Sequence, residues 1–169
     1  MRAGLSIVVS LGTVLALSAC SKSSGSAGTE APGPDAPPIS ASAPPTDAAK
    51  KAILATLPAA YQAADLENGQ AKFALCKSCH TATPGGESAV GPNLYGVFGR
   101  KAGSLPGFTY SDGVKALGFA WDADKIAQWI SNPRAMVPGT KMTYAGMENP
   151  RDRSDVVAYL KVLTTHPAN

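Results

Sequence analysis

The sequence predicts a mostly α-helical domain, in which three main helices are joined by long loops wrapped around a bound group. Helical patterns recur in the second half of the chain, but the 169 residues include 17 Gly and 14 Pro, which is too many turn-forming residues for an all-helical rod. The foldable part is about 120 residues long. A domain of that size with so many loops needs a covalent cross-link or a bound group to stabilise its fold. Three Cys and two His are the candidates.

We expect the main helices at residues 65–77, 122–131 and 151–164, and one turn around 111–116. Asp122 and Ser154 are the expected N-caps or first-turn residues of the last two helices. Residues 49–64 form a short pre-domain segment whose pattern fits a helix interrupted by Pro58. The sequence leaves open whether this segment packs on the domain at 65–169.

The first 19 residues have the pattern of a signal peptide. Arg2 supplies the positive start, and the apolar run from Leu5 to Leu17 is shorter than the roughly 20 residues that a membrane-spanning helix needs. The sequence Leu17-Ser18-Ala19-Cys20 resembles the bacterial lipobox, which implies cleavage before Cys20 and attachment of a diacylglycerol to its thiol. The alternative is ordinary signal-peptidase cleavage near Ala19.

Residues 20–48 then form the expected linker. They are rich in Ser, Gly, Ala, Pro and Thr and contain few large apolar side chains, so we expect a disordered segment that follows the lipidated Cys20. At full stretch it would reach about 90 Å. The net charge of the chain is +3 and no cluster of Lys and Arg is present, which argues against a nucleic-acid-binding surface.

The motif that carries chemistry is Cys76-Lys77-Ser78-Cys79-His80, whose C-x-x-C-H pattern is typical of covalent attachment of c-type haem. Two thiols on one helical turn are spaced to add to the two vinyl groups of a haem, and the next residue brings an imidazole beneath the iron. Two other uses of these residues stay open. One is a thioredoxin-like redox pair, which expects a βαβ context, and the other is a zinc site with His166 as the fourth ligand.

A second iron ligand is expected from the irregular stretch between the last two helices. Three methionines lie there, Met136, Met142 and Met147. A Pro-Gly turn and the hydroxyl of Thr140 precede Met142, so the loop can present the Met142 thioether to an iron bound by His80. We interpret Met136 and Met147 as packing residues.

The chain from about residue 65 to 163 resembles the class I c-type cytochromes, which include mitochondrial cytochrome c and soluble bacterial homologues. The resemblance implies the cytochrome c fold with one covalently bound haem c. It also implies that Gly69 and Phe73 of the first helix meet Val156 and Tyr159 of the last. Besides the haem motif, the matching segments run in order along the chain: Gly69 and Phe73, residues 91–94, 96–101 and 106–110, Trp121, residues 132–142 and residues 155–160.

The resemblance implies roles for residues around the haem. The carbonyl oxygen of Pro92 accepts the free ring N–H of His80, which fixes the orientation of the ring. Three residues hydrogen-bond or neutralise the buried propionates, and these are Arg100, Tyr110 and Trp121.

Some residues depart from the mitochondrial pattern. Val114 stands where the family often has an asparagine, and Trp129 replaces a tyrosine near the iron, so both change the polarity around the metal and tune the reduction potential. The ring of lysines around the exposed haem edge is thinner, with Leu75 and Glu148 at two of its positions. The remaining candidates for partner docking are Lys77, Lys101, Arg134 and Lys141.

These observations predict a monohaem electron carrier without catalytic residues, held on the periplasmic side of a bacterial membrane by a lipid on Cys20. Its expected partners are membrane redox complexes, such as a cytochrome bc1 complex, a cytochrome oxidase or a photosynthetic reaction centre, which it meets briefly as a monomer. The alternatives are a haem enzyme or gas-binding protein with an open sixth coordination site, or a dedicated electron-accepting subunit of a dehydrogenase.

Overall fold

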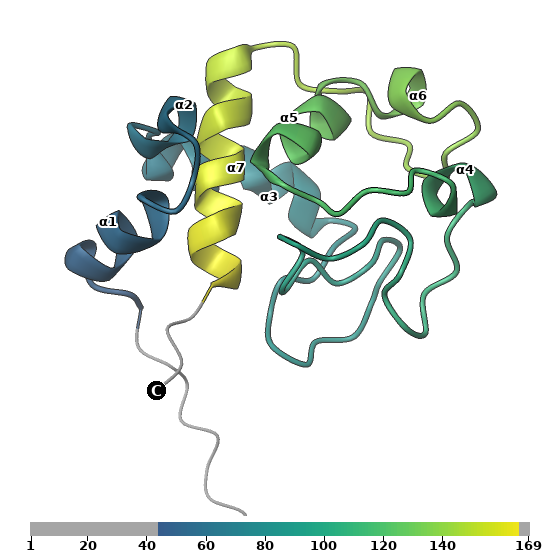
Figure 1. Cartoon of the computed structure of the whole chain (residues 1–169), viewed down its shortest axis with the longest axis horizontal. Coiled ribbons are helices and arrows are strands. Elements are labelled where there is room, and N and C mark those ends of the chain that lie inside the picture. The colour runs from purple at the N-terminus through teal and green to yellow at the C-terminus, as the bar shows by residue number, and fades with distance from the viewer. Residues whose placement is uncertain (1–43, 166–169) are drawn as a thin grey trace, which may run out of the picture. The chain divides into compact units, whose positions relative to one another are not determined.

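The computed structural model describes residues 44–165, and within this range the chain is helical with long connecting loops (Figure 1). The expected signal peptide, Cys20, residues 20–43 of the linker and His166 lie outside the described residues. The only β pairing in the described range is an isolated bridge between Lys101 and Ala120. The helices are α1 Asp47–Leu54, α2 Ala59–Gln62, α3 Leu66–Lys77, α4 Asp112–Lys115, α5 Ala123–Ser131, α6 Pro133–Met136 and α7 Pro150–Thr164.

The three predicted main helices are confirmed as α3, α5 and α7, and the predicted turn is α4. Asp65 and Asp122 cap α3 and α5, since each carboxylate accepts hydrogen bonds from backbone N–H groups in the first turn. The prediction for Ser154 was wrong. Asn149 caps α7 and Pro150 occupies its first position, so Ser154 lies one turn inside the helix and donates to the Pro150 carbonyl oxygen at 3.1 Å.

Helices α3 and α7 cross in close contact, as expected. A Cβ at Gly69 would lie 2.8 Å from the Cβ of Tyr159, so only glycine lets the two backbones approach this closely. Beside it the rings of Phe73 and Tyr159 pack with their centroids 5.6 Å apart. The buried carboxylate of Asp155 closes the crossing, because it accepts hydrogen bonds from the Asp65 N–H and the Asn68 side-chain amide, each at 2.8 Å.

The segment before the matched domain packs against it. Ile53, Leu57 and Tyr61 recur every fourth residue on α1, the turn that follows it and α2, and all three side chains are buried. The Tyr61 hydroxyl donates to Asp124 at 2.7 Å, which joins α2 to the first turn of α5. Burial and this hydrogen bond raise the pKa of Tyr61 well above its usual value. We call residues 47–62 the N-terminal arm.

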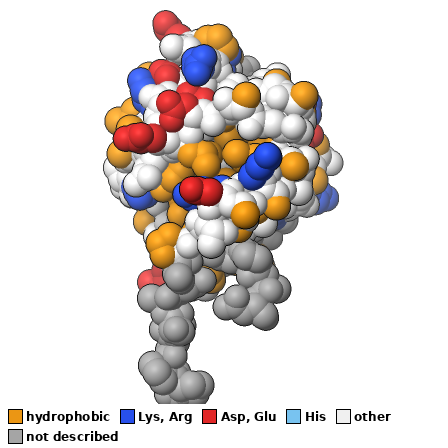
Figure 2. Space-filling view, turned by 90° about the vertical axis from the view of Figure 1, so that its left-hand side faces the viewer, with side chains coloured by type: hydrophobic (Ala, Val, Ile, Leu, Met, Phe, Trp, Pro, Cys, Tyr) orange, Lys and Arg blue, Asp and Glu red, His pale blue; other side chains and the backbone are white. Residues whose placement is uncertain are grey.

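The arm and the loop region lie on opposite sides of α7, with α1 and α2 to its left in Figure 1 and α4, α5, α6 and the loops to its right. Figure 2 views the molecule from the arm's side, where Lys, Arg, Asp and Glu side chains are interspersed around an apolar area. Among residues 44–165, none of the helices has the length and apolar character needed to cross a membrane.

Candidate functional site

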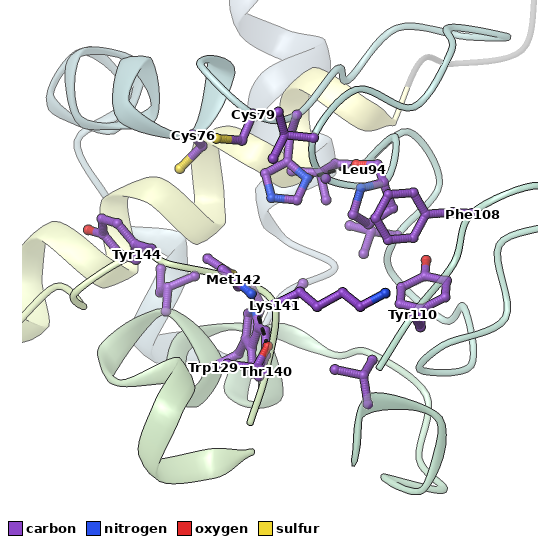
Figure 3. Close-up of a pocket in the computed structure, with 18 of the residues that line it drawn as sticks. Cys76, Cys79, Leu94, Phe108, Tyr110, Trp129, Thr140, Lys141, Met142 and Tyr144 are labelled. Carbon is purple, nitrogen blue, oxygen red and sulfur yellow. Dashed lines mark hydrogen bonds between the residues drawn. The ribbon is translucent and has the colours of Figure 1, made fainter. Parts of the chain in front are cut away.

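A cavity of about 370 Å³ opens among the loops, within the range of roughly 300–1,000 Å³ that is usual for cofactor pockets. Its walls come from the end of α3, the loops at 90–94, 108–111 and 140–144, and the inner faces of α5 and α7. The lining is mostly apolar, and its charged residues are two cations, Arg100 and Lys141, with no carboxylate. Cys76 and Cys79 lie on one side of the cavity, and Met142 and Trp129 lie on the other (Figure 3).

The last turn of α3 presents the two thiols and the imidazole. The backbone N–H groups of Cys79 and His80 both donate to the Cys76 carbonyl oxygen, at 3.1 and 2.9 Å, so the three side chains follow one helical turn. Both cysteines are free thiols. Burial, with a smaller contribution from Cys79, raises the pKa of Cys76 to about 11. A redox pair of the thioredoxin type needs a thiolate with a lowered pKa, so this environment does not favour that interpretation.

His80 is held in one orientation. Its Nδ1 lies 2.7 Å from the Pro92 carbonyl oxygen, which can only accept, so Nδ1 carries the proton and Nε2 keeps a free lone pair. Burial lowers the pKa of His80, although the hydrogen bond to Pro92 acts in the opposite direction, so the neutral ring is favoured. A Cβ at Gly91 would lie 2.6 Å from Nδ1, and glycine therefore leaves room for the ring. The result is a neutral, oriented imidazole, the form that binds a metal ion.

Met142 lies across the cavity from Cys76 and Cys79 (Figure 3). The Thr140 hydroxyl accepts a hydrogen bond from the Met142 N–H at 3.2 Å, which stabilises the turn before the thioether. Met142 lines the cavity, whereas Met136 and Met147 do not, and Met147 is buried in the core. The structure therefore brings one methionine into the cavity, and it is the one singled out from the sequence.

The polar end of the cavity is built by the Lys101–Ala120 bridge. The Trp121 N–H donates to the Arg100 carbonyl oxygen at 2.9 Å, so these two residues are neighbours across the bridge. Arg100 and Tyr110 also line the cavity, where burial lowers the pKa of Arg100 and raises that of Tyr110. A group carrying two carboxylates would find a guanidinium, a phenol and an indole here.

One residue of this end was missed by the sequence analysis. The Ser111 hydroxyl is buried at the cavity and has no hydrogen-bond partner within the described part of the chain. A buried hydroxyl without a partner is costly, so it points to a polar group of a ligand. A single serine beside Tyr110 gives no signal in the sequence that could have identified it.

Two of the departures from the mitochondrial pattern, Val114 and Trp129, line the cavity. Val114 is buried, and Trp129 packs on Trp121 with ring centroids 5.8 Å apart.

The four cations predicted to dock partners are spread over several segments. All four cations are exposed, but only Lys141 borders the cavity, while Lys77 ends α3, Lys101 belongs to the bridge and Arg134 lies on α6.

The alternatives for the cysteine motif find little support. A thioredoxin-like pair expects a βαβ unit, and residues 44–165 contain no strand beyond the isolated bridge. A zinc site needs four converging ligands, and the described residues contain no cluster of three or more His, Cys, Asp or Glu arranged to hold a metal ion.

Comparison with known proteins agrees with the geometry. The family model for cytochrome c matches residues 66–164. Cytochrome c2 of Rhodomicrobium vannielii is 48% identical over 101 residues, which cover 60% of this chain and 81% of that protein. Cytochrome c2 iso-2 of Magnetospirillum fulvum is 45% identical over 91 residues, or 54% of this chain and 94% of that protein. Cytochrome c2 of Blastochloris viridis is 40% identical over 109 residues, or 64% and 86%.

Proposed function

The chain belongs to the cytochrome c family and carries one covalently bound haem c as a monohaem electron carrier, and we propose that it works as a membrane-tethered shuttle in which His80 and Met142 would bind the iron. The observation that supports these ligands is one apolar cavity that both His80 and Met142 line, with Cys76 and Cys79 on one side of it and Met142 on the other. Haem c supplies an iron that cycles between Fe(III) and Fe(II).

The residues that line the cavity fit a haem c. The apolar walls suit a porphyrin, the thiols of Cys76 and Cys79 are free for thioether bonds, and the buried hydroxyl of Ser111 has no hydrogen-bond partner among residues 44–165. The Pro92 carbonyl oxygen accepts a hydrogen bond from Nδ1 of His80, which leaves Nε2 free to bind the iron, and the Thr140 hydroxyl accepts one from the N–H of Met142. If His80 and Met142 both bind the iron, the protein itself occupies the positions that a substrate would need, and the chain would act as an electron carrier.

Arg100, Tyr110 and Trp121 receive the propionates. A carboxylate buried in an apolar pocket is stabilised by a neighbouring cation and by hydrogen-bond donors, and these three side chains supply both. Trp129 and Val114 replace polar neighbours of Met142 and so keep this side of the cavity apolar, which tunes the reduction potential.

The tether is the lipid on Cys20 with the predicted linker at 20–48, on the periplasmic side of a bacterial membrane. Support comes from the lipobox and from the N-terminal arm, which ties the linker end of the chain to α7 on the side away from the cavity. Lys77, Lys101, Arg134 and Lys141 are exposed, and they would serve brief docking to a cytochrome bc1 complex, an oxidase or a reaction centre.

Mass spectrometry of the mature protein tests the cofactor and the tether together. We expect a chain that begins at Cys20, carries a diacylglycerol and is one haem heavier than its polypeptide. A Cys20→Ser variant should keep the haem and move to the soluble periplasmic fraction. A mature chain without acyl groups would refute the tether and leave the carrier function intact.

A further inference from the structure

Asn93 is a buried polar residue that the roles described so far do not explain. In the described part of the chain, the buried polar or charged side chains belong to Asn93, Asp155 and Thr164. Asp155 closes the crossing of α3 and α7, and the Thr164 hydroxyl donates to the Leu160 carbonyl oxygen within α7. Asn93 instead lies in a loop, directly after Pro92. A buried amide is costly unless it is hydrogen-bonded, so its partners indicate what it holds in place.

The Asn93 side chain uses both its amide N–H groups and its oxygen inside the loop. Nδ2 donates to the carbonyl oxygens of Thr83 and Gly86, at 2.9 and 2.6 Å, and Oδ1 accepts the Tyr95 N–H at 2.7 Å. Both acceptors of Nδ2 belong to one turn, because the Gly86 N–H donates to the Thr83 carbonyl oxygen at 3.1 Å. A Cβ at Gly86 would lie 2.9 Å from Nδ2, so glycine lets the turn approach the amide. The side chain therefore ties this turn to the segment that follows Pro92.

One rigid peptide group joins Asn93 to His80. The Pro92 carbonyl and the Asn93 N–H belong to the same planar peptide unit, so neither can turn without the other. The carbonyl oxygen lies 2.7 Å from Nδ1 of His80, and the N–H donates to the Ser88 hydroxyl at 3.2 Å. Proline has no N–H of its own, so the donor that helps to fix this segment comes from residue 93.

The backbone of Asn93 is also held on its carbonyl side. Its carbonyl oxygen accepts a hydrogen bond from Nη2 of Arg100 at 2.8 Å, and Nη1 of the same guanidinium donates to the Tyr95 carbonyl oxygen at 3.2 Å. Arg100 lines the cavity, so it connects this loop to the cavity wall. Together with the side-chain amide, these bonds leave the peptide group between Pro92 and Asn93 little freedom to move relative to His80.

We propose that Asn93 is a positioning residue that holds the Pro92 carbonyl oxygen against Nδ1 of His80. This inference rests on the proposed function, in which His80 would bind the iron. A hydrogen bond at Nδ1 makes an imidazole a more basic ligand, and a more basic ligand favours Fe(III) over Fe(II). Without the Asn93 amide, the turn at 83–86 no longer holds the peptide group, the hydrogen bond to His80 weakens, and the imidazole becomes a less basic ligand.

Hydrogen exchange on the reduced, haem-loaded protein tests this inference, because NMR can follow the Nδ1 proton of His80 separately from the backbone amides. Asn93→Ala should speed the exchange of this proton with deuterium oxide about tenfold relative to the amides of α3 and α7, as expected for a local opening that loses one buried hydrogen bond. Its midpoint potential should shift to more positive values. Ser88→Ala removes a partner of the same peptide group at an exposed position and should speed the exchange by a smaller factor, about threefold.

Two further variants are the controls. Asn149→Ala removes the cap of α7 and lowers overall stability, and Ser104→Ala removes a hydroxyl hydrogen bond in another exposed loop. Neither should change the midpoint potential or the exchange of the His80 proton relative to the amides.

An Asn93→Ala protein with the exchange ratio or the midpoint potential of the wild type would overturn the inference. If this variant does not take up haem, Ser88→Ala decides, and a wild-type exchange ratio in that variant would overturn the inference as well. His80 ring protons that lack the large shift imposed by a bound haem would instead refute the proposed iron ligand, while the hydrogen bonds of the loop would stand.

Discussion

Replacing Gly69 by alanine sets two opposite effects against each other at the crossing of α3 and α7. In the interior of a helix, alanine is more stable than glycine by about 1 kcal/mol because it restricts the unfolded chain. Here, however, the new Cβ would lie 2.7 Å from the carbonyl carbon of Asp155 and 2.8 Å from the Cβ of Tyr159. Backbone atoms cannot move aside unless the helices separate, and overpacking of this kind costs up to about 3 kcal/mol.

The steric cost should therefore exceed the gain, and we expect Gly69→Ala to lower the free energy of unfolding by about 2 kcal/mol. For a domain of this size the melting temperature should fall by about 8 °C. Far-ultraviolet circular dichroism of the haem-loaded protein, followed through guanidinium unfolding, measures the change. Gln70→Ala, at the exposed neighbouring position of α3, is the control and should stay within about 0.5 kcal/mol of the wild type. An increase in stability for Gly69→Ala would refute the close crossing.

Three further predictions concern the arm, the acid response and the role of the cofactor in folding. Leu57→Ala should cost about 2 kcal/mol or more in guanidinium unfolding because Leu57 is buried, and an unchanged midpoint would mean that the arm does not pack. Hydrogen bonds from Asn68, and to a smaller extent from Lys72, hold the pKa of Asp152 below its usual 3.8. The ionised Asp152 therefore stabilises the folded state above pH 3.8, and this stabilisation is lost as the pH falls through the lowered pKa. Asp152→Asn should flatten the acid limb of the stability curve, and a limb identical to the wild type would contradict this. The double variant Cys76→Ala/Cys79→Ala should lose most of its helical signal, and full native helicity would show that the chain folds without haem.

The parts of the site that are local in sequence were predictable. The haem motif lies at the end of α3, and one helical turn sets the spacing of Cys76, Cys79 and His80. That Met142 lines the cavity was also predictable, since few methionines lie between helices and this one follows a Pro-Gly turn.

Features that depend on distant packing were not predictable. Ile53, Leu57 and Tyr61 show a helical spacing, but Pro58 interrupts it, and nothing in the sequence indicates that α7 and Asp124 lie beside them. Whether a segment next to a linker packs or stays free depends on the apolar surface available elsewhere in the chain. The buried hydroxyl of Ser111 likewise becomes informative only in the structure, where no described residue is its hydrogen-bond partner.

The most direct test of the site is the visible spectrum and midpoint potential of a Met142→Ala variant, compared with Met136→Ala, a methionine outside the cavity. Loss of a thioether ligand should abolish the weak sulfur-to-iron(III) charge-transfer band, lower the midpoint potential and allow the reduced protein to bind carbon monoxide, whereas Met136→Ala should keep the wild-type values. If Met142→Ala retains the band and the potential of the wild type, the iron is not bound by Met142 and the proposed coordination is wrong.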